Sequence, residues 1–257
     1  MNYLDAIILG LMQGLTEFLP ISSSGHLVLT EHLLGVKMPG VSFELIVHLG
    51  TLFSVLVYFR KRIWTISKSV FIPSDMVNRK MIFYIIIATI PVVLIALLLK
   101  SQIEEAFQSP LITSFALLIT GIILLLTALS DKGTRELKLP RALIIGLGQA
   151  LAIFPGISRS GTSISAGLFA GVKPMVAAEF SFLLSIPAIC GAIVFMISDL
   201  FAIDPALFGQ YLTGAVVSFL SGLLAVYILL DFIRKGMFKY FGLYCLMIGT
   251  FGIIYFS

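Results

Sequence analysis

The chain has 257 residues, of which 59% are hydrophobic and only 12% are charged, and its formal net charge is +4. Soluble domains carry about 25% charged residues, so the composition excludes an ordinary water-soluble globular protein. Long continuous apolar runs, rather than short alternating segments, favour membrane-spanning helices over a β-barrel. We therefore expect an all-α integral membrane protein.

The first residues, MNYLDAIILGLMQG, carry Asp5 and lack both a basic region and a small-residue cleavage site. A cleaved signal peptide is therefore not expected. Cys190 and Cys245 both lie in apolar runs, which argues against a disulfide framework or a cysteine metal site. The positive charge is spread over loops, so it indicates membrane topology and predicts no nucleic-acid partner.

Two apolar segments, 3–34 and 141–172, are broken by Pro, Gly and Ser. The pieces on either side of each break are too short to cross a bilayer, so each segment predicts a re-entrant helix pair. Six other apolar segments approach the ~20 residues that a spanning helix needs. These predicted transmembrane helices are 41–59, 81–99, 110–129, 175–198, 206–230 and 239–256.

The loops between these segments differ in charge. Loops 60–80, 130–141 and 231–239 are rich in Lys and Arg, whereas 100–109 and 199–205 contain few basic residues. The positive-inside rule places the three basic loops in the cytoplasm. This alternation agrees with six spans.

The two broken segments contain similar motifs, QGLTEFLPISSSGH from Gln13 and QALAIFPGISRSGTSI from Gln149. Three spanning segments follow each motif, so the second copy must be inverted relative to the first. The sequence thus predicts a first repeat over 1–130 and a second, inverted repeat over 131–257, which together form one membrane domain. Such repeats place the site at their interface, between discontinuous helices. The alternative is a chance similarity between two Gly/Pro breaks.

Arg159 stands alone in about thirty otherwise uncharged residues. Because a guanidinium at membrane depth costs several kcal/mol, it normally faces the protein interior and has an anionic partner. Arginine also matches the geometry of phosphate oxygens. The hydroxyl and glycine residues around it predict an anion site at a helix N-terminus. The alternative for these small residues is close helix packing.

The first motif supplies complementary groups. Glu17 follows Gln13 by four residues, so both lie on one helical face. Pro20 is expected to end that helix, residues 22–25 to form the break, and His26 to open the next helix. Glu17 or His26 is a candidate base and Ser23 a candidate nucleophile, with Arg159 clamping the oxyanion. Alternatively, the serines only cap a helix and His26 binds a backbone carbonyl.

Two further polar residues, Glu44 and His48 in SFELIVHLGT, are again four apart on one helical face. We expect them to support the site from outside it. Glu179 occupies a related place at the start of the first span of the second half, which strengthens the prediction of a repeat.

At this point the chain resembles the bacterial undecaprenyl-diphosphate phosphatases, the bacitracin-resistance protein family. QGLTEFLPISSSGH is similar to that family's (E/Q)xxxE and PxSSxGH motif, and PGISRSGTSI to its PGxSRSGxT/S motif. FELIVHLGT is similar to the segment that follows the first motif. The resemblance covers essentially the whole chain.

The resemblance implies a hydrolase that converts undecaprenyl diphosphate to undecaprenyl phosphate, the lipid carrier of peptidoglycan synthesis, and that confers bacitracin resistance. It also implies six spanning helices and two re-entrant pairs in an inverted repeat. The implied location is the bacterial cell membrane, with the site open to the outer or periplasmic side. A divalent cation, Mg²⁺ or Ca²⁺, is implied as the cofactor.

Carried over by motif position, the resemblance makes four residues catalytic: Glu17, Ser23, His26 and Arg159. Gln13 stands where many members have Glu, which weakens a two-carboxylate metal scheme and leaves Glu17 as the expected ligand. Ser163 stands where Thr is common. The expected phosphate-binding set is Gln13, Ser22, Ser24, Gly25, Ser158, Ser160, Gly161, Thr162 and Ser163.

Several alternatives stay open. The nucleophile is Ser23, His26 or a water activated by Glu17. A polyprenyl-phosphate flippase is the main rival, because inverted repeats with re-entrant tips are a transport architecture. A phosphatase that pairs a PSGH motif with distant histidines does not fit, since the histidines are His26, His32 and His48. The expected partners are a polyprenyl diphosphate and membrane lipids, and the small-residue run 167–171 suits either a homodimer or internal packing.

Overall fold

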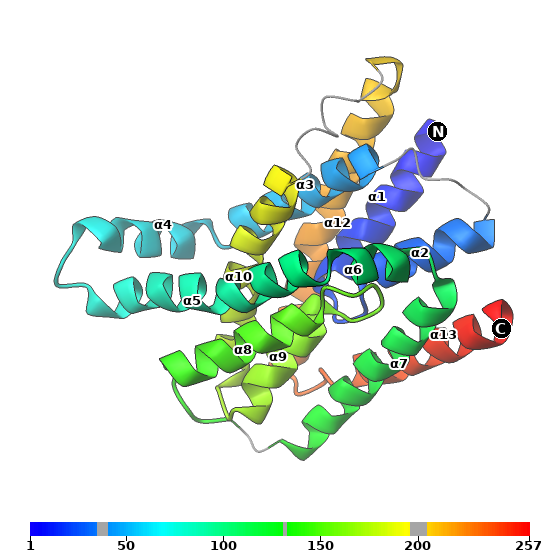
Figure 1. Ribbon diagram of the computed structural model, residues 1–257. Coiled ribbons are helices and arrows are strands. Elements are labelled where there is room, and N and C mark those ends of the chain that lie inside the picture. The colour runs from blue at the N-terminus through cyan, green and yellow to red at the C-terminus, as the bar shows by residue number, and fades with distance from the viewer. Residues whose placement is uncertain (35–40, 131–132, 196–204) are drawn as a thin grey trace.

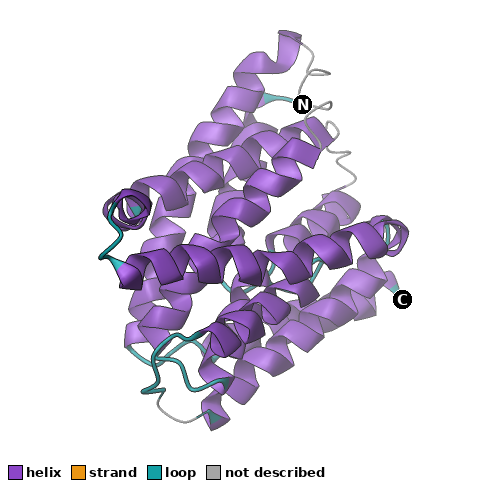
Figure 2. Ribbon diagram, turned by 60° about the vertical axis from the view of Figure 1, so that its left-hand side comes forward, coloured by secondary structure: helices purple, strands orange, loops and turns teal. Residues whose placement is uncertain are grey.

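The protein is described from a computed structural model that covers residues 1–34, 41–130, 133–195 and 205–257. Figures 1 and 2 show that helices make up nearly all of this part of the chain. Arg135 and Val172 form an isolated parallel β-bridge between two loops. The prediction of an all-α membrane protein is confirmed.

Both broken segments fold as pairs of short helices. The first pair is α1 (Tyr3–Phe18) and α2 (Ser23–Leu34), and the second is α8 (Leu139–Leu151) and α9 (Arg159–Phe169). One detail of the prediction is wrong, because the first break covers residues 19–22 and Ser23 already belongs to α2. His26 therefore lies in the first turn of α2, one turn after the break.

Four of the expected spans are helices long and apolar enough to cross a membrane. They are α5 (Met76–Leu98), α7 (Pro110–Leu126, continued by η2, Thr127–Leu129), α10 (Pro174–Phe195) and α12 (Phe208–Arg234, preceded by η3, Pro205–Leu207). The expected end of the fourth span, 196–198, and most of the loop 199–205 lie outside the described residues.

The other two expected spans are also helices, but neither counts by itself as a helix long and apolar enough to cross a membrane. After α3 (Val41–Tyr58) the chain bends by 73° into α4 (Arg60–Lys68) and η1 (Ser69–Phe71). The three consecutive cations at 60–62 explain the bend, since they cannot continue into hydrocarbon. α13 (Tyr240–Phe256) has 17 residues and is about 26 Å long, slightly short of the bilayer core. By length and composition, the described helices give four spans, or up to five if the bent pair is one span.

Two helical segments lie outside the predicted apolar runs, the first turn of α5 and a separate short helix. α5 begins at Met76 rather than residue 81 because the Asp75 side chain accepts a bond from the Asn78 backbone N–H and caps the helix. Hydrogen bonds from Asn78 also hold the pKa of the Asp75 carboxyl below its usual value. α6 (Lys100–Phe107) is a short helix where only a loop was expected.

The helices of the two predicted repeats interleave. α1 packs along α12, and α8 packs along α5; α3 also lies on α12, and α10 on α5. α7 packs on α13, as Figure 1 shows near the C-terminus. A twofold exchange of the halves would require this reciprocal pairing, so it supports the repeat, which stays a prediction.

Candidate active site

The two breaks meet inside the fold through hydrogen bonds. The Ser22 hydroxyl accepts bonds from the backbone N–H groups of Gly25 at 3.2 Å and of Gly156 at 3.1 Å. In return, the Ser160 hydroxyl donates to the Leu19 carbonyl at 3.3 Å. Each break thus satisfies backbone groups of the other, which fixes their relative position.

The backbone at this junction is unusual. Ser22 has a φ of 69° and Gly156 a φ of 91°, both in the left-handed region. Gly25 packs against the backbone of Gly156, and a Cβ added at Gly25 would lie 3.0 Å from the Gly156 Cα. The glycines permit this close approach, whereas Ser22 bears strain that its hydrogen bonds offset.

Ser22 and Ser158 each cap the helix that follows them. The Ser158 hydroxyl accepts from Gly161 N–H at 3.1 Å and caps α9, as Ser22 does for α2. In consequence, Ser23 and Arg159 hold corresponding places as the first residues of their helices. The two first residues differ completely in chemistry.

Glu17 lies at the centre of a polar cluster that both motifs form. Its Oε1 accepts from Arg159 Nη2 at 2.5 Å, and its Oε2 accepts from Ser23 Oγ at 2.6 Å and from Gln13 Nε2 at 3.0 Å. The Glu17 side chain is 8% exposed and that of Arg159 is 15% exposed. The structure therefore brings together four residues that the sequence predicted, across 142 positions of the chain.

His48 approaches the same carboxylate. Its Nε2 lies 3.7 Å from Glu17 Oε2, and its Nδ1 donates to the Glu44 carbonyl at 2.8 Å. Glu44 thus orients the His48 ring through its main chain. The supporting role expected for the pair stays a prediction.

Both ring nitrogens of His26 have partners other than Glu17 and Arg159. Its Nδ1 lies 2.8 Å from the Ser22 carbonyl, and its Nε2 lies 2.8 Å from the Tyr244 hydroxyl. Tyr244 belongs to neither motif, and sequence reasoning missed it. A contact across 218 residues leaves no local pattern by which it could have been found.

The remaining predicted residues mainly organise the two breaks. Ser24 Oγ lies 3.4 Å from Ser22 Oγ, and Thr162 donates to the Ser158 carbonyl at 2.8 Å. The Ser163 hydroxyl lies 2.6 Å from both the Arg159 carbonyl and the Ser181 hydroxyl. These bonds shape the helix starts, so the side chains of Thr162 and Ser163 are already engaged.

Two buried atoms of the cluster lack hydrogen-bond partners within the described part of the chain: Arg159 Nη1 and Gln13 Oε1. An unpaired buried guanidinium N–H is costly unless a ligand satisfies it. Arg159 Nη1 belongs to a cationic donor, and Gln13 Oε1 is a neutral acceptor. The cluster can therefore receive an anion at Arg159 and a donor or cation at Gln13.

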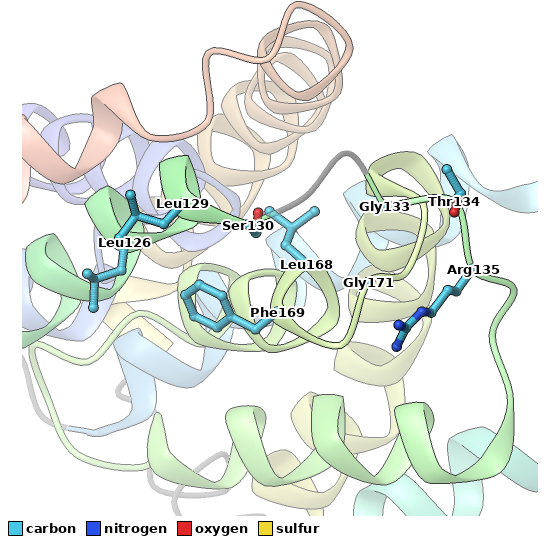
Figure 3. Close-up of a pocket in the computed structure, with 9 residues that line it drawn as sticks. All are labelled: Leu126, Leu129, Ser130, Gly133, Thr134, Arg135, Leu168, Phe169 and Gly171. Atoms are coloured by element: carbon cyan, nitrogen blue, oxygen red, sulfur yellow. The ribbon is translucent and has the colours of Figure 1, made fainter.

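Two larger hollows lie elsewhere on the described surface. A cavity of about 580 Å³ borders Ser130, Arg135, Phe169 and Gly171, and Figure 3 shows it at the end of α9, without any residue of the cluster. An apolar groove of about 540 Å³ runs between α1, α12 and α13 and reaches His26 and Tyr244. Neither contains Glu17 or Arg159.

No group of three His, Cys, Asp or Glu side chains suited to a metal ion occurs among the described residues. Mg²⁺ usually needs only one or two protein carboxylates, because water and substrate phosphates complete its shell. Glu17 and the unpaired Gln13 Oε1 fit that requirement as oxygen ligands.

The fold and the cluster together define a multi-pass α-helical membrane protein with a buried polar cluster of Glu17, Arg159, Ser23 and Gln13 between two helix breaks. Residues 6–251 match the model of the family described as bacitracin resistance protein BacA, and the chain belongs to that family. Similar curated proteins are named undecaprenyl-diphosphatase. One from Korarchaeum cryptofilum is 43% identical over 97% of each chain, and one from Syntrophotalea carbinolica is 42% identical over 97% of each. A third, from Methanobrevibacter smithii, is 40% identical over 97% of this chain and 96% of its own.

Proposed function

We propose that this protein is an undecaprenyl-diphosphatase, which hydrolyses undecaprenyl diphosphate to undecaprenyl phosphate and inorganic phosphate. One observation carries the proposal. Arg159 holds Glu17 with Nη2, and its buried Nη1 has no partner among the described residues, while Ser23 donates to the same carboxylate. Nucleophile, base and anion clamp are thus in contact before substrate arrives.

The chemical steps follow from this geometry. Ser23 Oγ attacks the terminal phosphorus as its proton passes to Glu17, and the bond from that phosphorus to the bridging oxygen breaks. Undecaprenyl phosphate leaves and takes up the proton from Glu17. Water then attacks the phosphorus of the phosphoserine, the bond from that phosphorus to Ser23 Oγ breaks, and a proton of the water reaches Oγ through Glu17, which releases inorganic phosphate and restores Ser23. Arg159 and the first turn of α9 stabilise the charge on the phosphoryl oxygens in both steps.

Ser23 is the favoured nucleophile among the three alternatives. Its hydroxyl lies 2.6 Å from the base, whereas both ring nitrogens of His26 have other partners. Attack by a water activated by Glu17 is the remaining route, and it would leave no phosphoserine.

The proposed cofactor is a divalent cation, Mg²⁺ or Ca²⁺, held by Glu17, Gln13 Oε1 and substrate oxygens. When bound, it would neutralise charge on the diphosphate. Arg159 and Ser23 act on the phosphoryl group in the same way with or without this contribution.

The substrate's two ends fit a site within a membrane protein, because the diphosphate needs polar ligands and the prenyl chain needs hydrocarbon. We place the protein in the cell membrane with its basic loops in the cytoplasm and the site open to the outer side. The reciprocal pairing of α1 with α12 and of α8 with α5 also favours a second candidate activity, movement of the lipid phosphate across the membrane.

The test is phosphate release from undecaprenyl diphosphate by the purified protein in detergent, with Mg²⁺ or Ca²⁺ present. We expect release by the wild type and its loss in Ser23→Ala, Glu17→Ala and Arg159→Ala. An exposed control, Arg234→Ala, should retain wild-type activity. An inactive wild type would contradict the proposal and direct attention to lipid transport in liposomes, which Ser23→Ala should leave intact.

A further inference from the structure

The hydrogen bonds of His26 fix the state of its ring. A carbonyl oxygen can only accept, so the Ser22 carbonyl at 2.8 Å requires a hydrogen on Nδ1. In the neutral ring Nε2 is then an acceptor, and the Tyr244 hydroxyl at 2.8 Å donates to it. Tyr244, His26 and Ser22 therefore form one directed chain of hydrogen bonds.

This chain ends on the residue that orients Ser23. Ser22 has the left-handed φ of 69° and caps α2, and Ser23 directly follows it. A strained residue keeps its conformation only when its surroundings determine it. The His26 bond to the Ser22 carbonyl is one such determinant, so it also affects where the Ser23 hydroxyl lies relative to Glu17.

Two further contacts hold Tyr244 in place beside His26. The rings of Tyr244 and His26 are stacked, with centroids 5.6 Å apart and an interplanar angle of 5°. The next residue, Cys245, is buried and its Sγ lies 3.6 Å from the Pro20 carbonyl. α13 therefore contacts α2 through Tyr244 and the first break through Cys245, two successive residues.

The surroundings strengthen the Tyr244 hydrogen bond. The groove that reaches the pair is lined mainly by apolar side chains, including Leu15, Phe232 and Phe241. Water competes poorly for a hydroxyl in such a place, and a hydrogen bond is stronger at low dielectric.

We propose that Tyr244 is a positioning residue for phosphoryl transfer: its hydroxyl fixes the His26 ring, which holds the Ser22 turn and so places Ser23 against Glu17. The inference rests on the proposed function. It assigns a part in the reaction to α13, which contributes no residue to the Glu17 cluster.

The test compares Tyr244→Phe, which removes one oxygen and keeps the ring, with Tyr255→Phe, an exposed control on the same helix. We expect kcat of Tyr244→Phe to fall about tenfold, as for one lost hydrogen bond, with KM unchanged because Arg159 is untouched. Tyr255→Phe should match the wild type. In a His26→Gln background, Tyr244→Phe should cost nothing further, since the effect passes through His26.

A readout independent of activity is the ¹⁵N NMR spectrum of histidine-labelled protein, with the His26 signal identified by its loss in His26→Gln. We expect hydrogen on Nδ1 in the wild type, and in Tyr244→Phe a shift of the Nε2 resonance that Tyr255→Phe does not cause. Hydrogen on Nε2, an unmoved resonance, or an unchanged kcat would overturn the inference. If the wild type released no phosphate, the proposed function would fail separately, and the spectra would still decide whether the contact exists.

Discussion

At the scale of single residues, the site depends on one carboxylate with three donors. Glu17 binds Arg159, Ser23 and Gln13, and His48 lies 3.7 Å away. A carboxylate held by a guanidinium stays ionised and can therefore accept a proton from Ser23. Because Arg159 Nη1 has no hydrogen-bond partner among the described residues, the guanidinium can bind the carboxylate and an anionic ligand at once.

Arg159→Lys should abolish most activity although it keeps the charge. An ammonium group cannot hold Glu17 and present a second fixed donor in the geometry of the guanidinium fork. We expect kcat/KM to fall by about 10²–10³, the usual cost of one transition-state donor. Phosphate release measures the effect, and a loss of less than about threefold would contradict it. The matched control is Arg234→Lys at an exposed position.

Glu17→Gln should destabilise the protein as well as inactivate it. Removing one partner of a buried ion pair typically costs about 3–5 kcal/mol, and the partial exposure of Arg159 puts the loss at the lower end. The double variant Glu17→Gln with Arg159→Met should recover part of the stability and none of the activity. Thermal unfolding in detergent is the measurement, and equal midpoints for the two variants would count against the pair.

At the scale of elements, the two helix breaks determine the position of the Glu17 cluster more directly than the long apolar helices do. Pro, Gly and Ser predicted both breaks, because these residues end helices and cap the next ones whatever their surroundings. The start of α5 at Met76 was not predicted, nor was the helix α4 that follows the predicted end of the first span. A hydropathy pattern indicates which residues can lie in the hydrocarbon of the membrane. The first residue of a helix is instead set by its N-cap, such as Asp75 for α5.

Gly156→Ala should weaken the junction of the two breaks. The residue has a φ of 91°, and an added Cβ would collide with the Thr113 carbonyl oxygen. Strain of this kind costs about 1–3 kcal/mol before the collision is counted. We expect a lower unfolding midpoint and reduced phosphate release.

Gly191→Ala is the control for that variant, since an added Cβ there meets nothing within 4 Å. Because alanine is a better helix former than glycine, its midpoint should stay level or rise slightly. If both glycine variants behaved alike, the junction would not be the sensitive place that its geometry indicates.

At the scale of the whole molecule, the sequence predicted which residues meet but not everything that holds them. The sequence allowed three site residues to be predicted, Glu17, Ser23 and Arg159. Charged and polar groups at membrane depth are costly, so their presence there indicates a function. Tyr244 could not be predicted, because aromatic residues are ordinary in membrane helices and its partner lies 218 positions away. The count of six spans stays a prediction, because by length and composition the described helices give four spans, or up to five if the bent pair is one span.

The proposed orientation can be tested by cysteine labelling. In a variant with Cys190→Ser and Cys245→Ala, single changes at two exposed residues, Glu104→Cys and Lys68→Cys, report on opposite faces. A membrane-impermeant maleimide should label Glu104→Cys in intact cells and Lys68→Cys only after permeabilisation. The reverse pattern would invert the protein and place the open side of the site in the cytoplasm.

The matching caps at Ser22 and Ser158 have a consequence for stoichiometry. Two breaks with the same backbone bonds would form two equal sites if their side chains also matched, yet one presents Ser23 where the other presents Arg159. At the place four residues after the motif's glutamine, the first has Glu17 and the second has Ile153. We therefore expect a single reaction centre per chain, and a phosphate mimic such as vanadate should saturate at one equivalent.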